Sequence, residues 1–435
     1  MSEGISTGRT HIVMVPGFAG FDALGQLEYY SGITPIFQRW RESGRGQCVL
    51  HYFGNLPTAG VATRARALRS YLAKRLARAE FQPGDRLCLV GHSTGGLDIR
   101  RLILDLRYDS APDAVDGPQP IARQVSPGTL LEMVGRVVFL SVPQLGTNIA
   151  DWVRAHRVER KIAVAQMRQS VGAAAHVPSV DQMEAWVAGR LAAFTGADLL
   201  LAVQDALSEM DTRARSDASG AAEAREAAAE LALWLRHIDA DFNAIDDLCS
   251  QAPEDSQSPA HRGLEGRKEE LALWAECSIR SLSFATLGTR AFRFEPGEPA
   301  PAWKLWSPSS WTELEHGASG CDVAYRLSYR ACAGGSFQAS ADIQAPTQFF
   351  DGSPAPAIER WDNDGIVNTA SMFWPNGADT RLVRADHGDI IGHFELAPAE
   401  PNSGRKYHTY DLLNSDSRAT FQRTTLERVW NEVFD

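Results

Sequence analysis

The chain has 435 residues, enough to bury a large core in one or two domains. Its hydrophobic content of 44% and charged content of 22% are typical of a globular protein. A net charge of −11 argues against a nucleic-acid partner, and no run of about 18 apolar residues predicts a transmembrane segment. The N-terminal residues lack the regions of a secretory signal, so we expect a cytoplasmic protein.

Short apolar runs rich in β-branched residues predict strands, and apolar residues three and four apart predict helices. In the first 150 residues the predicted strands cover 11–15, 47–53, 86–91 and 135–141, and the predicted helices cover 64–79 and 93–106. Strands that alternate with helices indicate βαβ units. The expected fold class is therefore α/β, with a mostly parallel central sheet flanked by helices.

Residues 155–278 differ from the rest, because they are rich in Ala, Glu, Arg and Leu and carry few strand signals. They form either a helical bundle that packs on the sheet or a cap over a site at its edge. Strands predicted at 281–288 and 380–385 and a helix within 419–434 then complete the sheet. We therefore divide the chain into a first core part (1–154), a helical lid or cap insertion (155–278) and a second core part (279–435).

The six cysteines are scattered and include no CxxC pair. In a chain of this length they are typical of buried thiols, and a bridge between Cys321 and Cys332 stays open.

A serine stands between a predicted strand and a predicted helix, in the sequence GHSTG at Gly91–Gly95. Small residues beside Ser93 permit the sharp turn that exposes a nucleophilic hydroxyl at the start of a helix. Such a nucleophile needs two amide donors for the oxyanion that forms on the substrate. The N–H of Thr94 is the first candidate, and the N–H of Phe18, after the turn at Gly17, is the second.

The serine also needs a base, and in this arrangement an acid and then a histidine follow it in the chain. His387 lies just past a predicted strand and is favoured over His393, six residues later. For the acid, Asp364 precedes a glycine turn and is favoured over Asp362. Asp386 is adjacent to His387 and points elsewhere in an extended chain.

These stretches together resemble the bacterial triacylglycerol lipases of the α/β-hydrolase superfamily. In family order they are residues 15–33, 89–100, 139–153, 281–286, 363–367 and 386–389. The resemblance implies a catalytic triad of Ser93, Asp364 and His387. It also implies an oxyanion hole at Phe18 and Thr94 and a helical lid drawn from the middle segment.

Two residues depart from the family pattern, because Pro16 and Gln144 stand where histidines are common. Some family members bind calcium beside the histidine loop, and Asp389 matches one of their ligands. Since no second ligand is evident from the sequence, we assign no metal and predict no cofactor.

The sequence therefore predicts a serine-dependent carboxylic ester hydrolase, a lipase or esterase that acts through an acyl-enzyme on an apolar ester. An acyltransferase, a phospholipase or a thioesterase would need the same triad. A binding protein on a hydrolase scaffold is the alternative from another class. The oligomeric state stays open.

Overall fold

The computed structural model describes residues 8–18, 23–24, 27–44, 47–82, 84–108, 126–155, 243–253, 256–291, 323–334, 344–377, 379–394, 411–413, 415 and 421–435. Most of the predicted lid lies outside these ranges.

Six parallel strands form one sheet in the order β4-β1-β5-β6-β7-β8. Their bounds are Cys48–Tyr52 (β4), Thr10–Val15 (β1), Arg86–His92 (β5), Val134–Leu140 (β6), Arg280–Leu287 (β7) and Thr380–Arg384 (β8). A separate hairpin pairs β2 (Ala23–Leu24) with β3 (Leu27–Glu28). The parallel sheet and its flanking helices confirm the predicted fold class.

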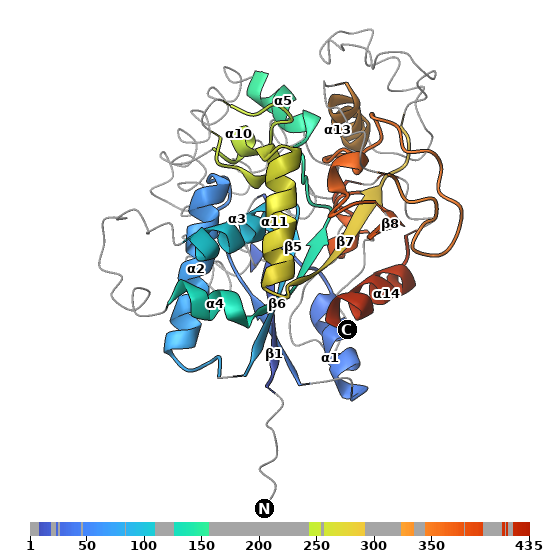
Figure 1. The fold of residues 1–435 in the computed structure, drawn as a ribbon. Coiled ribbons are helices and arrows are strands. Elements are labelled where there is room, and N and C mark those ends of the chain that lie inside the picture. The colour runs from blue at the N-terminus through green and yellow to red at the C-terminus, as the bar shows by residue number, and fades with distance from the viewer. Residues whose placement is uncertain are drawn as a thin grey trace, which may run out of the picture.

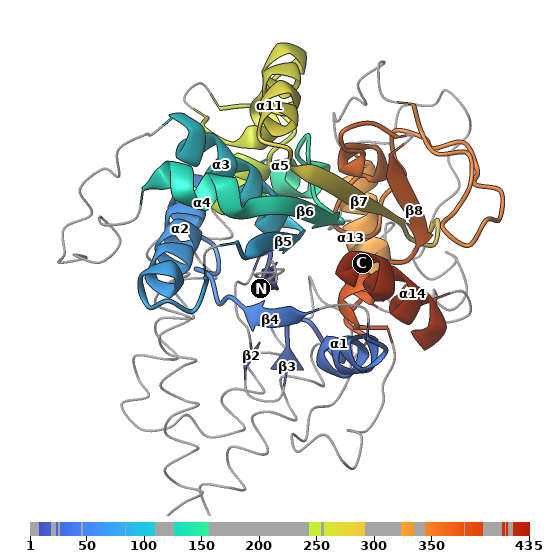
Figure 2. The same ribbon diagram turned by 60° about the horizontal axis from the view of Figure 1, so that its bottom comes forward.

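Helices cover both faces of the sheet, as Figures 1 and 2 show. Their bounds are Ile33–Glu42 (α1), Val61–Ala77 (α2), Thr94–Tyr108 (α3), Pro127–Met133 (α4), Asn148–Ala155 (α5), Ala244–Leu248 (α10), Leu264–Glu276 (α11), Val323–Ala333 (α13) and Arg423–Phe434 (α14). Within the described ranges, three short 3₁₀ helices span Pro259–His261 (η2), Thr369–Met372 (η3) and Asp389–Ile391 (η4). No helix in the described ranges has the length and apolar character to cross a membrane.

Two apolar layers hold these helices to the sheet. On one face, side chains of α2, α3, α4 and α11 pack with alternate residues of the strands, such as Val13 and Leu89. On the other face, α1 and α14 pack on the intervening residues, such as Ile12 and Val90. Successive side chains of a strand point to opposite faces, so strands covered on both sides must be apolar throughout. This is why the strands were evident as continuous apolar runs.

A buried ion pair fixes the end of the predicted lid segment to the core. The guanidinium of Arg100 in α3 makes two 2.8 Å hydrogen bonds to Glu270 in α11, and both side chains are fully buried. Arg100 also stacks on Trp374, 4.0 Å from the ring centroid, and donates to the side chain of Gln144. Residues 259–276 therefore pack as part of the core, and the boundary predicted at 278 stays a prediction.

The order of the strands reverses next to the candidate residues. From β1 the chain moves outward to β4 and then returns across β1 to β5. In open α/β sheets, ligands bind beyond the carboxyl ends of the strands where the order reverses in this way. The loops that follow β1 and β5 carry Gly17 and Ser93.

Candidate active site

Ser93 occupies a strained turn between β5 and α3. Its φ of 52° lies in the left-handed region, which costs a residue with a Cβ roughly 1–2 kcal/mol. The turn is tight because Gly95 packs on the end of β1, and a Cβ there would lie 2.4 Å from the carbonyl oxygen of Val15. The backbone N–H of Ser93 donates to Leu140 at 2.9 Å and anchors the turn to β6. Strain of this kind concentrates at functional sites.

The loop after β1 lies directly against this turn. A Cβ on Gly17 would lie 2.6 Å from the Cβ of Ser93 and 2.8 Å from the carbonyl oxygen of His92, so only glycine fits. Phe18 follows, with 37% of its surface exposed. Thr94 is buried and is the first residue of α3. Of the two residues predicted to supply the oxyanion hole, Thr94 therefore follows Ser93 in the chain, and Phe18 follows the glycine that packs on Ser93.

A buried arginine holds the loop after β1 in place. Nη2 of Arg64 in α2 donates to the carbonyl oxygens of Pro16 and Gly17, at 2.8 and 2.9 Å. Its Nε donates to the carboxylate of Asp98 in α3 at 2.9 Å. Burial raises the pKa of Asp98 to about 6, although the Arg64 charge opposes this shift. The carbonyls of Pro16 and Gly17 therefore both point toward Arg64.

The predicted acid lies in a loop that orients its carboxylate. Oδ1 of Asp364 accepts the backbone N–H groups of Ile366 and Val367 at 3.0 and 2.8 Å. Oδ2 accepts the hydroxyl of Thr286, at the end of β7, at 2.6 Å. Gly365 makes the turn possible, with a φ of 95°. The carboxylate is fully buried and fixed by three donors.

His387 lies beside this carboxylate, in the loop after β8. Its Nδ1 is 2.8 Å from Oδ2 of Asp364, and its backbone N–H donates to the Asp364 carbonyl at 3.0 Å. A carboxylate can only accept, so this bond places the proton on Nδ1 and leaves Nε2 able to act as a base. The ring is 4.6 Å, centroid to centroid, from that of His92, the residue before Ser93.

The alternatives weighed for the base and the acid have other partners. Asp362 makes a two-bond ion pair with Arg290, at 2.7 and 2.6 Å. Nε2 of His393 is 3.1 Å from the carbonyl oxygen of Tyr29, to which it donates. Asp386 accepts two backbone N–H groups within its own loop. Of the candidates, Asp364 and His387 are the pair that the structure brings together.

The parallel sheet, the strained serine turn after β5 and the paired acid and histidine after β7 and β8 recur together in one fold. The chain has an α/β-hydrolase fold. No protein-family model matches its sequence, and no curated protein matches it.

Several solved structures align with this chain. EstA from Clostridium botulinum aligns with a TM-score of 0.43 and 16% identity, over 88% of this chain and 83% of its own. Lipase 1 from Pelosinus fermentans aligns with a TM-score of 0.41 and 16% identity, over 88% and 93%. The lipase of Staphylococcus hyicus has a TM-score of 0.43 and 14% identity, over 98% and 94%.

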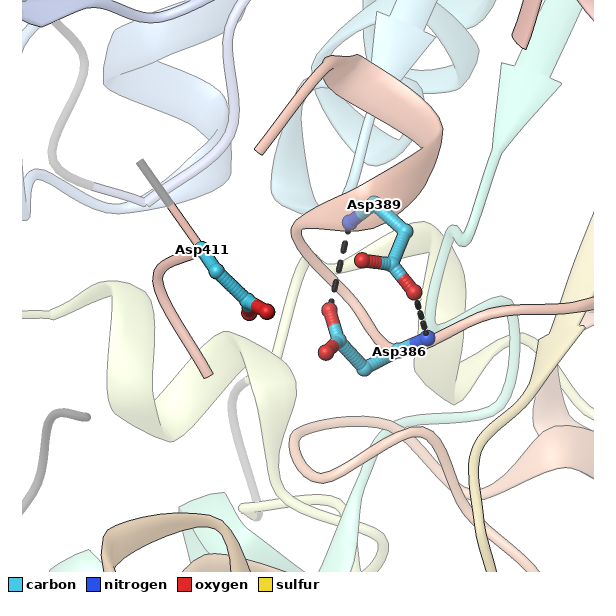
Figure 3. Close-up of side chains that lie close together, drawn as sticks. All are labelled: Asp386, Asp389 and Asp411. Carbon is cyan, nitrogen blue, oxygen red and sulfur yellow. Dashed lines mark hydrogen bonds between the residues drawn. The ribbon is translucent and has the colours of Figure 1, made fainter. Parts of the chain in front are cut away.

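Three buried carboxylates lie together next to the histidine loop (Figure 3). Asp386 and Asp389 flank His387, and Asp411 comes from a separate segment. Each offers an oxygen within 4.8 Å of the other two. Burial, and then the charge of Asp411, raise the pKa of Asp386. Calcium prefers carboxylate oxygens at about 2.3–2.6 Å, so oxygens this close suit one ion. These residues fit a calcium ion. Its charge would offset the charges of the three carboxylates, and the ion would join the segment of Asp386 and Asp389 to that of Asp411.

We expect calcium to raise the melting temperature of the protein and EDTA to lower it, because an ion held by folded carboxylates stabilises only the folded state. The matched variant is Asp411→Asn, which removes one carboxylate of the cluster. Its melting temperature should not respond to calcium, and without calcium it should equal or exceed that of the wild type, since one repulsive charge is gone. Equal melting temperatures of the wild type with calcium and with EDTA would exclude the ion.

Several residues of the site were not predicted from the sequence. Arg64, Thr286 and Asp411 reach it from distant segments, and nothing in their local sequence marks them. Tyr29 is a further one, because its hydroxyl contacts both Gly17 and His92. His92 stands inside the GHSTG sequence, so that motif was the available signal for its position.

Proposed function

We propose that the protein is a serine-dependent carboxylic ester hydrolase that acts on apolar esters. The observation that carries this proposal is the 2.8 Å contact between His387 and Asp364, beside a serine in a strained turn. A serine hydroxyl is a weak nucleophile at neutral pH and requires such a base.

In the first half of the reaction, Ser93 Oγ attacks the ester carbonyl carbon while His387 Nε2 takes the hydroxyl proton. Asp364 holds the imidazole in the required tautomer and stabilises the imidazolium. The backbone N–H groups of Phe18 and Thr94 donate to the oxyanion. The carbon–oxygen bond of the ester then breaks, and His387 returns the proton to the departing alcohol.

In the second half, a water molecule attacks the acyl-enzyme. His387 takes a proton from this water as its oxygen bonds to the acyl carbon. The tetrahedral intermediate collapses, the bond to Ser93 Oγ breaks, and the proton passes from His387 to the serine. The carboxylic acid leaves, and the enzyme is restored.

An apolar substrate is supported by the surroundings of the serine. Phe18 presents an exposed aromatic ring next to the residue that packs on Ser93. The helices predicted to form a lid over the site would add further apolar surface, and this part of the proposal rests on the sequence alone.

Hydrolysis of p-nitrophenyl esters with acyl chains from acetate to palmitate tests the proposal. We expect turnover to rise from acetate to a longer chain, because a longer acyl group buries more apolar surface, at about 0.8 kcal/mol per methylene. Turnover highest on acetate would contradict the apolar substrate. No turnover on any ester by the folded protein would contradict the hydrolase.

A further inference from the structure

A row of hydrogen bonds close to Ser93 connects the loop after β1 with the histidine loop, which is the loop after β8 that carries His387. The N–H of Gly17 donates to the Tyr29 hydroxyl at 2.7 Å. The same hydroxyl is 2.7 Å from Nδ1 of His92. Nε2 of His92 is 3.0 Å from the carbonyl oxygen of His387. Tyr29 and His92 are both buried.

The direction of every bond in this row follows from its two ends. The carbonyl of His387 can only accept, so Nε2 of His92 carries a proton. Burial lowers the pKa of His92 well below its usual range, and the ring is therefore neutral. Its Nδ1 must then accept the Tyr29 proton, which leaves the hydroxyl oxygen to accept the N–H of Gly17. Buried polar networks in which every member is satisfied confer rigidity.

The backbone around Tyr29 contacts the histidine loop as well. The N–H of Ser31 donates to the carbonyl of Ile391 at 2.8 Å, and His393 donates to the carbonyl of Tyr29 at 3.1 Å. A Cβ on Gly392 would lie 1.9 Å from the carbonyl oxygen of Ser31, so the two segments touch. The residues around Tyr29 thus contact both the loop after β1 and the histidine loop.

We propose that Tyr29 and His92 are positioning residues. They hold the loop after β1, at Gly17, and the loop after β8, at His387, at a fixed distance and orientation on either side of Ser93. The proposal rests on the proposed function of these loops. Neither residue reacts. They keep the oxyanion donor of Phe18 and the base of His387 in the places that one substrate carbonyl requires, and a displacement of about 1 Å there costs on the order of a hundredfold in rate.

Three variants break the row, two of them at the bond between Tyr29 and His92 and one at the bond between His92 and His387. Tyr29→Phe removes the hydroxyl. His92→Gln places an amide N–H where Nε2 was and keeps the bond to His387, but it loses the acceptor for Tyr29. His92→Asn keeps an acceptor where Nδ1 was and loses the bond to His387. Tyr30→Phe is the matched control, because it removes a neighbouring buried hydroxyl whose bond goes to Val15 instead.

We expect Tyr29→Phe and His92→Gln each to lower kcat on p-nitrophenyl butyrate by about 10- to 100-fold with little change in KM. Affinity for an alkylboronic acid, whose tetrahedral adduct places an oxygen in the oxyanion hole, should fall in parallel. The double variant that combines Tyr29→Phe with His92→Gln should be no slower than either single variant, because both substitutions break the same contact between Tyr29 and His92. His92→Asn, which breaks the other contact, should also be slow, and Tyr30→Phe should keep the wild-type kcat.

Hydrogen exchange measured on each variant gives a readout that does not depend on activity. In Tyr29→Phe, exchange should become faster in the peptides over both 16–18 and 387–393, whereas Tyr30→Phe should leave the second peptide unchanged. Faster exchange in the first peptide alone, or equal effects of the two variants, would overturn the coupling. If the wild type neither hydrolyses esters nor binds the boronic acid, the proposed function fails, and exchange still decides the coupling.

Discussion

Replacing Ser93 with Ala is expected to lower kcat for ester hydrolysis by roughly 10⁵- to 10⁶-fold, the scale on which removal of a nucleophilic serine acts. The attacking oxygen is lost, while Asp364 and His387 keep their contact. Substrate binding should persist, so KM or an inhibition constant should change little. Steady-state kinetics on p-nitrophenyl esters measures this directly. A decrease of less than tenfold would assign the reaction to another residue.

A second variant at the same position separates chemistry from strain. Because Ser93 has a φ of 52°, Gly fits the turn without the steric cost that Ala shares with Ser. We expect Ser93→Gly to be as inactive as Ser93→Ala and about 1 kcal/mol more stable in urea denaturation. If Gly and Ala gave the same stability, the turn would not be strained in solution.

Replacing Asp364 with Asn should lower kcat by about 10⁴-fold with the fold retained. The amide can donate to Nδ1 of His387 and so favours the tautomer whose proton lies on Nε2, which then cannot accept from Ser93. It also cannot stabilise an imidazolium. The decrease should appear in kcat more than in KM.

Asp362→Asn is the matched control, two residues away in the same loop and equally buried. Its carboxylate pairs with Arg290, so this variant should lose stability and keep kcat within about tenfold of the wild type, because loss of a buried pair acts on folding. Equal decreases in kcat for Asp364→Asn and Asp362→Asn would show that catalysis depends on the intact loop rather than on the Asp364 carboxylate.

Much of the fold could be predicted from the sequence. Strands such as Thr10–Val15 and Arg86–His92 are covered on both faces, so their apolar runs are continuous and easily recognised. The helix at Ile33–Glu42 was not predicted. It begins after Gly32, whose φ is 67°, and has no side-chain cap that would mark its start. Its stability comes from packing on α14, almost 400 residues later in the chain.

The residues of the candidate site also differ in whether the local sequence predicts them. Ser93 and His387 follow strands, and Asp364 stands in a short turn motif before Gly365, so their order in the chain was informative. Arg64 and Tyr29 act through contacts with segments far from them in sequence, such as the 2.8 Å bond from Arg64 to Pro16. Asp411 joins Asp386 and Asp389 only once the chain is folded. No local pattern encodes such contacts.

Reaction with a fluorophosphonate, followed by intact-mass and peptide mass spectrometry, tests the role of Ser93 most directly. We predict one adduct per chain, located on Ser93, which is absent from Ser93→Ala and forms much more slowly in Asp364→Asn. A folded protein that forms no adduct, or an adduct on another residue that persists in Ser93→Ala, would contradict the assignment of Ser93 as the nucleophile.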